Sequence, residues 1–452
     1  MSLKSTATRD MTRGSILKQI VLFSLPLMMG NVFQMLYNTV DSIVVGNFVG
    51  KEALAAVGAT TMIVNMLVFF FNGFSVGAGV VIAQHFGARD HERLHAAIET
   101  TMAMTFILCA GFTAVGLVLV RPMLRMMATP EDVFEDAATY LSIYFYGFSG
   151  LLIYNMGSGI LRAVGDTTRP LLFLILTSLL NIVLDLAFVI GLNAGIAGVA
   201  WATILSQMVS AALILRLLTR TDDIYRLVWR DLSVDGPLLR RIFAVGLPAG
   251  LQSVITAFSN IFVQSYINYF GSSCMAGWSC YNKLDQFIML PIQSTSMAST
   301  TFVSQNIGAR QEARAHRGTL TAIALSVGIT GVVGLAIMLF AVPAVMLFSP
   351  DQAVIDYGVM FIRANTLFFL FNCVNHTLAG ALRGRGDSRG PMVIMLTSFV
   401  VIRQIYLFIM TRYIVNSAFW VGFGYPIGWM CCFVIQLCYY IVRWRRPMKA
   451  LP

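Results

Sequence analysis

The chain has 452 residues, of which 57% are hydrophobic and only 12% are charged, and its formal net charge is +10. Soluble domains carry about 25% charged residues, so a chain this apolar needs a bilayer to keep its hydrophobic surface away from water. The basic residues lie in short segments between apolar runs, without a stripe of interleaved aromatics, which argues against nucleic-acid binding. The seven cysteines form no CxxC pair and predict neither a zinc site nor a disulfide framework.

Apolar segments follow one another along the whole chain, and each is long enough to cross a bilayer as a helix of about 20 residues. Lipid leaves no backbone group unpaired, and the segments are too long for barrel strands. We therefore predict an all-α integral membrane protein with twelve transmembrane helices. The expected segments are 17–44, 56–83, 95–119, 138–161, 170–191, 194–217, 241–268, 276–304, 318–347, 356–381, 391–413 and 417–442.

The distribution of Lys and Arg predicts how these segments are oriented. Both chain ends and the even-numbered connections hold 24 of the 31 basic residues. The opposite side has Lys51, Arg121, Arg125 and Arg412, and three more lie within or at the ends of segments: Lys283, Arg363 and Arg403. Because basic residues are retained on the cytoplasmic side, we predict a multi-pass protein of the cell (inner or plasma) membrane with both termini in the cytoplasm.

The chain also repeats itself. The stretch 159–166 returns as 380–387 at an offset of 221, whereas Leu25-Pro26 returns as Leu247-Pro248 at an offset of 222. Each copy spans six segments, so both halves enter the membrane in the same direction, as in transporters whose site lies between parallel repeats. An old duplication kept only for packing is the alternative. The predicted organisation is a tail at 1–16, a first six-helix bundle at 17–217, a linker at 218–240, a second six-helix bundle at 241–442 and a tail at 443–452.

Two carboxylates stand out in the first half, because ionisable groups inside lipid are costly and are functional candidates by default. Asp41 and Asp185 lie near the outer ends of their segments, at similar predicted depths. Asn181 precedes Asp185 by four residues and shares its helix face, and Thr203 lies on the next segment. A desolvated carboxylate can exchange a proton, and the same oxygens can ligate sodium. Asp41 could alternatively cap its helix at the headgroups.

The second half does not repeat these acids. At the offsets above, Asp41 corresponds to Val263 and Asp185 to Tyr406. We therefore expect ion coupling to reside in the first half. In the second half, His376 could relay a proton or be an ordinary core histidine, and both interpretations stay open.

Several other features have ordinary structural interpretations. Lys283 and Asp285 predict a local ion pair or a headgroup contact, and Pro26 and Pro248 predict helix kinks that serve either as gates or as static bends. The stretch Gly73–Gly77 fits a nucleophile-elbow pattern, but it lies in mid-helix, where small residues allow close helix contact. No phosphate-binding loop is present. We predict no enzymatic activity and no cofactor.

Ordered motifs along the chain resemble those of a known family. They are Ser24–Leu27, Gln34–Asn38, Asp41, Val45-Gly46, Ala53–Gly58, Gln84 with Gly87-Ala88, and Leu161-Arg162-Ala163 with Gly165-Asp166-Thr167 and Pro170, the last two with second copies. Together they are similar to the multidrug and toxic compound extrusion (MATE) transporters over essentially the whole chain. The resemblance implies two six-helix lobes around a V-shaped cavity, and export of organic, cationic or amphipathic compounds against inward H+ or Na+.

The resemblance also implies roles for individual residues. The cation site of the DinF-like branch, where Na+ would bind if it is the coupling ion, corresponds here to Asp41, Asn181, Asp185 and Thr203. Gln34, Tyr140 and Asn155 correspond to cavity positions of the family. The other candidate substrate-cavity residues, chosen as polar residues within the apolar segments, are Tyr37, Asn38, Asn372 and His376. The NorM-like branch carries acids in its second lobe, but the segment 241–268 has none and Asn372 stands about where one would sit. This departure favours coupling through Asp41 and Asp185.

The alternative function is a flippase for a lipid-linked sugar or related lipid of the same superfamily. Such proteins often have a strongly cationic cavity, whereas few intramembrane basic residues occur here, chiefly Arg403. A membrane-embedded enzyme is a third class, which no metal-ligand or nucleophile cluster supports. We expect a monomer that contacts small organic molecules and the bilayer, with H+ or Na+ as coupling ion. The physiological substrate and the choice of ion stay open.

Overall fold

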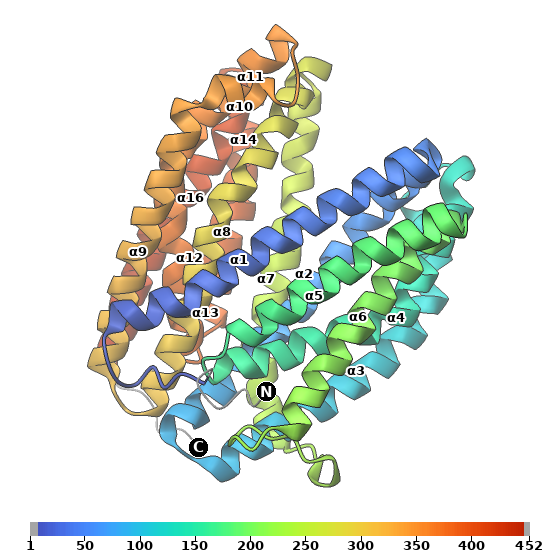
Figure 1. Cartoon of the computed structure of the whole chain (residues 1–452). Helices are drawn as coiled ribbons and strands as arrows, with labels where there is room; N and C mark the ends of the chain where they lie inside the picture. The colour runs from blue at the N-terminus through green and yellow to red at the C-terminus, as the bar shows by residue number, and fades with distance from the viewer. Residues whose placement is uncertain (1–7, 447–452) are drawn as a thin grey trace. The chain divides into compact units, whose positions relative to one another are not determined.

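The computed structural model describes residues 8–446, apart from the side chains of Ser42, Lys51, Glu52 and Leu54. Lys4, Lys449 and the rest of residues 1–7 and 447–452 lie outside the described range, as does the side chain of Lys51, so this part of the predicted tails and charge asymmetry is not placed. All regular secondary structure within residues 8–446 is helical (Figure 1), which confirms the predicted all-α class.

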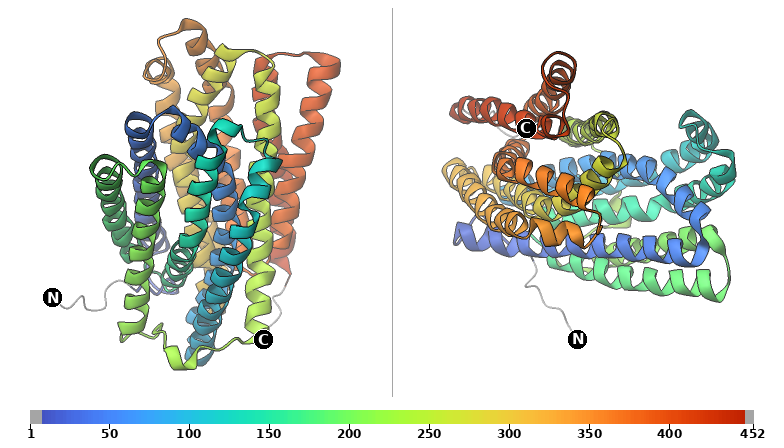
Figure 2. Two further views of the ribbon diagram at one scale, coloured as in Figure 1. Left: turned by 90° about the vertical axis from the view of Figure 1, so that its right-hand side faces the viewer. Right: turned by 90° about the horizontal axis from the view of Figure 1, so that it is seen from above.

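The chain folds into two compact units. The described part of the first unit comprises residues 8–10 and 25–250. Its helices are most of α1 (Ile16–Val44) with the π-helical η1 (Val45–Val49), α2 (Lys51–Ala88), α3 (His91–Met126), α4 (Glu131–Ala163), α5 (Thr168–Leu186) with the π-helical η2 (Ala187–Gly191), α6 (Gly195–Arg220), the 3-10 turn η3 (Trp229–Asp231) and the first turns of α7 (Gly236–Asn268). Figure 2 shows the same chain from two further sides.

The described part of the second unit comprises residues 11–24 and 251–446. Its helices are the first turns of α1, most of α7, α8 (Ser272–Gly308), α9 (Glu312–Leu339), α10 (Ala341–Met346), α11 (Gln352–Asn365), η4 (Thr366–Phe368), α12 (Phe369–Gly384), α13 (Arg389–Leu396), η5 (Thr397–Ile402), α14 (Arg403–Ile409), η6 (Met410–Ile414), α15 (Ala418–Gly422) and α16 (Gly424–Arg445). Of these, η5 and η6 are π-helical and η4 is a 3-10 turn.

Exposed apolar side chains show which faces meet lipid. On α5, Leu172, Leu176, Leu179 and Val183 follow helical spacing and are 53–62% exposed. Ten helical stretches within the described residues are long and apolar enough to cross a membrane. The two other long helices, α4 and α8, each pack against four neighbouring helices of their own unit.

The one-residue shift between the two repeat offsets has a local structural cause. The first half contains the π-helical η1 after α1, where the second half has only the regular end of α7, and the offset falls from 222 to 221. The second half contains η5 where α5 of the first half is regular, and the offset returns to 222. Each π turn accommodates one extra residue. Asp185 therefore corresponds to Leu407 rather than to the predicted Tyr406, and the second half still carries no acid there.

The duplicated sequence signature produces a duplicated turn. Gly165 and Gly386 have φ angles of 88° and 86°, a left-handed conformation that costs glycine little. The next residue caps the following helix in both halves. Asp166 Oδ1 accepts from the backbone N–H of Thr168 at 3.0 Å, and Asp387 Oδ1 accepts from the N–H three residues later at 3.1 Å. The repeated Gly-Asp pair thus sets how α5 and α13 begin.

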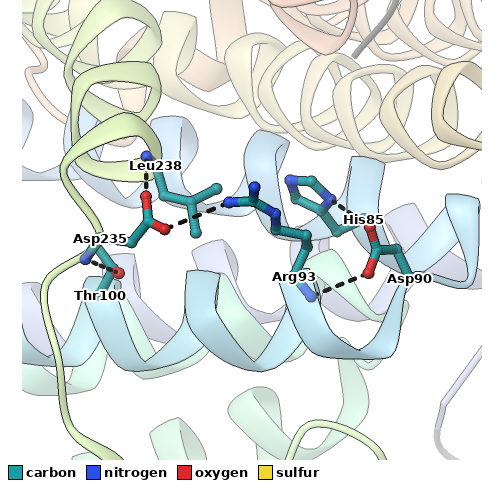
Figure 3. Close-up of polar contacts among 6 residues, drawn as sticks. All are labelled: His85, Asp90, Arg93, Thr100, Asp235 and Leu238. Atoms are coloured by element: carbon teal, nitrogen blue, oxygen red, sulfur yellow. Dashed lines mark hydrogen bonds and ion pairs between the residues drawn. The ribbon is translucent and has the colours of Figure 1, made fainter. Parts of the chain in front are cut away.

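The end of the linker is fixed to the first unit by a polar network (Figure 3). Asp235 caps α7 by accepting from the N–H of Leu238 at 2.9 Å, and its own N–H donates to Thr100 Oγ1 at 3.0 Å. Its second carboxylate oxygen pairs with Arg93 Nη1 at 3.4 Å. Arg93 is in turn held through its backbone N–H by Asp90 at 3.1 Å. These contacts attach the start of α7 to α3.

Four glycines let α7 touch α2 closely within the first unit. A Cβ atom on Gly73 would lie 2.2 Å from the backbone nitrogen of Gly250, and one on Gly77 would lie 2.5 Å from the carbonyl oxygen of Ile242. A Cβ on Gly246 would lie 2.9 Å from the Cα atom of residue 74. Such distances leave no room for a side chain. The predicted role of the stretch 73–77 in close helix contact is therefore confirmed.

The second unit holds the segment before α1 in a corresponding way. Gln305 accepts from the backbone N–H of Met11 at 2.9 Å, and Arg314 Nη2 donates to the carbonyl of the same residue at 3.2 Å. At the 221 offset, Gln305 and Arg314 correspond to Gln84, which accepts from Arg241 at 2.8 Å, and to Arg93. The boundaries of the two compact units lie inside α1 and α7, beside Pro26 and Pro248.

Replacing Asp235 by alanine should loosen the start of α7. The helix loses its cap, which costs about 1 kcal/mol, while the partly exposed ion pair adds little. We expect tryptic cleavage in the linker, at Arg226 or Arg230, to accelerate roughly fivefold. Asp235→Asn is the matched control, because asparagine caps equally well but cannot form the ion pair. Cleavage as fast in the asparagine variant as in the alanine variant would contradict the capping role.

Candidate functional site

A cavity of about 330 Å³ lies inside the first unit. Its walls come from α1, α2, α4, α5 and α6, and both apolar and polar side chains line it. From α1 it receives Gln34, Tyr37, Asn38 and Asp41, which follow one another at helical spacing. A single face of α1 therefore supplies the acid and three neutral polar groups to the same space.

The structure brings the four predicted cation-site residues together. Asn181 and Asp185 lie one turn apart on α5, and both are buried, as is Thr203 on α6. With its amide oriented to satisfy hydrogen bonding, Asn181 donates to Asp185 Oδ2 at 3.1 Å and accepts from the N–H of Thr203 at 3.3 Å. The carboxyl groups of Asp41 and Asp185 lie within hydrogen-bonding reach of each other. The acidic pair thus connects α1 to α5.

Each acid stands just before a π-helical segment. Asp41 lies four residues before η1 at Val45, and Asp185 lies two residues before η2 at Ala187. Both helices therefore leave regular α geometry within four residues of the acid. Interruptions of this kind occur frequently at functional sites, because they re-aim side chains and weaken the backbone ladder.

Both acids keep an oxygen without a partner. Oδ1 of Asp41 and Oδ1 of Asp185 are buried and accept no hydrogen bond. A buried polar atom without a partner is costly, and native structures rarely leave one unexplained. A proton or a hard cation such as Na+ would satisfy these oxygens. The donor set, which is made of oxygen atoms from carboxyl, amide and hydroxyl groups, fits either ion.

Tyrosines surround the acidic pair. The Tyr37 side chain forms a hydrogen bond with Thr203, and that of Tyr144 forms one with Gln207. Tyr140 is buried and also lines the cavity. These phenol rings present hydroxyl groups and aromatic faces to the same space. Aromatic faces attract organic cations, so the cavity combines negative charge with surfaces that suit a cationic ligand.

The candidate cavity residues of the first half all line this space, whereas those of the second half lie elsewhere. Gln34, Tyr37, Asn38, Tyr140 and Asn155 belong to the cavity wall. The two remaining candidates are on α12 in the second unit: Asn372, whose Nδ2 is 3.5 Å from the Met289 sulfur, and His376, whose carbonyl accepts from Ser296 at 2.7 Å. A substrate contact for Asn372 and His376 stays a prediction.

Sequence reasoning missed several polar residues of the cavity. Thr61, Asn65 and Asn72 of α2 line it, together with Thr177 of α5 and Ser210 of α6, whose hydroxyls are 2.8 Å apart. The three α2 residues are four and then seven positions apart, so they share one helix face. Marking polar residues at helical spacing within the apolar segment 56–83 would have found them.

Comparisons with known proteins agree with this architecture. The sequence model of the MatE family matches the chain twice, over residues 26–187 and 248–409. The chain is 30% identical to a Bacillus subtilis protein named "Probable multidrug resistance protein YpnP", over 96% of this chain and 97% of that protein. It is 27% identical to "Probable multidrug resistance protein NorM" of Thermotoga maritima, over 88% of this chain and 86% of the other.

Solved structures give the same result. A crystal structure of a MATE transporter in the straight conformation matches with a TM-score of 0.91 and 28% identity, and covers 98% of this chain and 99% of its own. One in the bent conformation matches with a TM-score of 0.91 and 27% identity, and covers 96% of both chains. These full-length matches confirm the prediction of twelve transmembrane helices in two six-helix lobes.

Proposed function

Because the chain belongs to the MatE family of multidrug and toxic compound extrusion transporters, we propose that it exports organic cationic or amphipathic compounds in exchange for H+ or Na+. Membership makes it a multi-pass membrane protein of a transporter family. The observation that carries the proposal is the buried Asp41–Asp185 pair, whose first member lines the cavity of the first unit.

The geometry of the pair explains how an ion and an organic cation can exclude each other. Two adjacent carboxylates repel, and a hydrogen bond between two carboxyl groups requires a proton, because carboxylates have no donor. Without a proton or Na+, Asp41 presents negative charge to the cavity and attracts an organic cation. Uptake of a proton or Na+ reduces that negative charge and lowers the affinity of the cavity for the organic cation. Competition for one charge couples the two fluxes, since each ligand changes the affinity for the other.

The proposed direction of transport follows from the positive-inside rule. Arg93 contacts the residue before α7, and Arg314 contacts Met11 before α1. Both arginines belong to the basic connections that the rule places in the cytoplasm. Both termini are then cytoplasmic, and the acidic pair lies toward the outer ends of α1 and α5. Ions that enter from outside reach the pair first, which suits their inward movement during export. The bacterial plasma membrane is the proposed location.

The test is ethidium flux in proteoliposomes with a proton gradient and a sodium gradient imposed separately. Flux driven by the proton gradient alone would show that the pair works by protonation, and flux that requires sodium would show that it binds the metal. Protein-free liposomes and liposomes with the gradient collapsed by an ionophore are the controls. Flux driven by neither gradient would overturn the antiport proposal and favour the lipid flippase.

A further inference from the structure

A buried cation lies in the second unit, outside the cavity described above. Arg403 begins α14 and is only 3% exposed. Its Nη2 donates to Ser259 Oγ at 2.8 Å and to Asn260 Oδ1 at 2.9 Å, and its guanidinium carbon lies 4.6 Å from the centre of the Tyr425 ring. Its Nε is buried and has no hydrogen-bond partner. The charge is therefore held by hydroxyl, amide and aromatic groups.

The cation lacks a direct counter-ion. Among the side chains that the structure describes, no carboxylate forms an ion pair with Arg403, and such a buried charge is costly. Asp285 interacts with a residue that also contacts Arg403. It forms a hydrogen bond with Tyr281 and interacts electrostatically with Tyr425. Lys283 lies 4.9 Å over the Phe348 ring, so Lys283 and Asp285 have different partners. Asp285 is thus available to balance Arg403 through Tyr425.

The repeat places this arginine at a defined position. After η5 the offset between the halves is 222, and the two stretches matched by the family model are separated by the same offset. Arg403 therefore corresponds to Asn181, the amide that binds Asp185. Asn260 corresponds to Asn38 of the cavity wall at the same offset. Tyr425 lies on α16, which follows in the second half as α6, the helix of Thr203, follows in the first.

The two halves thus carry chemically different side chains at this equivalent position. The first half has an amide there, beside two acids that are suited to an exchangeable cation. The second half has a guanidinium there, with neutral partners and an aromatic ring. A guanidinium is always charged and cannot leave. We propose that Arg403 is a tethered cation, which permanently fills in the second half the place that an exchangeable cation takes in the first.

This inference rests on the proposed function only for the role of the first-half pair. Its own content is that the side chains around Arg403 form a binding site for a cation, and specifically for a planar guanidinium. It follows that the second half has no ion cycle of its own. The transporter then exchanges ions through one half, although both halves share one fold.

The experiment asks whether a free cation can replace the tethered one. Arg403→Ala is made in an Asp41→Asn, Asp185→Asn background, so that the first-half acids do not contribute, and thermal stability of the purified protein is measured. We expect the Tm to fall by roughly 5 °C, and millimolar methylguanidinium to restore most of the loss. Urea at the same concentration is the control, because it has nearly the same planar shape without charge. It should restore nothing.

Further variants keep the proposal falsifiable if the alanine protein does not fold. Arg403→Lys keeps the charge and should melt closer to the background protein than Arg403→Met, which keeps the length of the side chain without charge. A methionine variant as stable as the background protein would overturn the proposal, and so would equal rescue by urea and methylguanidinium or no rescue by either. Because the readout is stability without transport, failure of the antiport proposal leaves the result interpretable.

Discussion

Gradient-driven export is expected to fall to the level of protein-free liposomes when Asp41 and Asp185 are both replaced by asparagine. Asparagine preserves the shape of each side chain but can neither exchange a proton nor present negative charge to the cavity. An ion gradient can shift the equilibrium between two conformations of the transporter only if the ion binds one of them more tightly. The double variant lacks the acids that would bind the ion. The measurement is ethidium flux under the ion gradient that drives the unaltered protein.

Two controls separate loss of coupling from loss of fold. Removing two adjacent like charges relieves repulsion, so the double variant should melt at the same temperature as the unaltered protein or higher. Asp132→Asn changes an exposed acid at the start of α4 and should leave flux unchanged. Full export by the double variant would refute coupling through the pair, since no other acid lines the described cavity.

The second large effect is expected from Gly77→Val on α2. Even a Cβ atom at this position would lie 2.5 Å from the Ile242 carbonyl oxygen and 2.6 Å from the Gly246 nitrogen. Both are backbone atoms, so relief requires that α2 and α7 move apart. Overpacking of this kind costs about 3 kcal/mol. The expected result is a large drop in Tm and in the yield of folded protein, measured after extraction in detergent.

Gly58 provides the matched control on the same helix. A Cβ atom there would meet nothing within 4 Å, so Gly58→Ala should be neutral or stabilise by about 0.5–1 kcal/mol through helix propensity. If Gly77→Val melted at the same temperature as Gly58→Ala, the contact between α2 and α7 would not matter for stability.

The helices and the acidic cluster could be predicted because local rules determine them. Lipid forces long apolar runs into helices whatever their neighbours are, and helical spacing alone puts Asn181 and Asp185 on one face. The direction of successive helices then brings Asp41 and Asp185 to a similar depth, with Thr203 somewhat deeper on the returning helix. The polar face of α2 followed the same rule and was missed only because Thr61, Asn65 and Asn72 are uncharged.

The boundaries of the two compact units are decided by contacts between distant residues. Nothing near Gly246 in the sequence shows that it faces Gly77, and nothing near Met11 shows that Gln305 binds its backbone. The π-helical segments were also invisible, since they alter backbone hydrogen bonding without a distinctive composition. One of them, η5, shifts the repeat by one residue. Leu407 is therefore the residue of the second half that corresponds to Asp185, and Arg403 is the one that corresponds to Asn181.

The first turns of α1 belong to the second unit, and the first turns of α7 belong to the first unit. This division has a consequence for the order in which the units can fold during synthesis. A chain made from its N-terminus has produced all the described residues of the first unit once residue 250 is complete, so that unit can finish folding early. The second unit needs residues 11–24, which are made first, together with residues that are made last. Its earliest part must therefore wait for nearly the whole chain, and a separately expressed second half would lack one of its own helical segments.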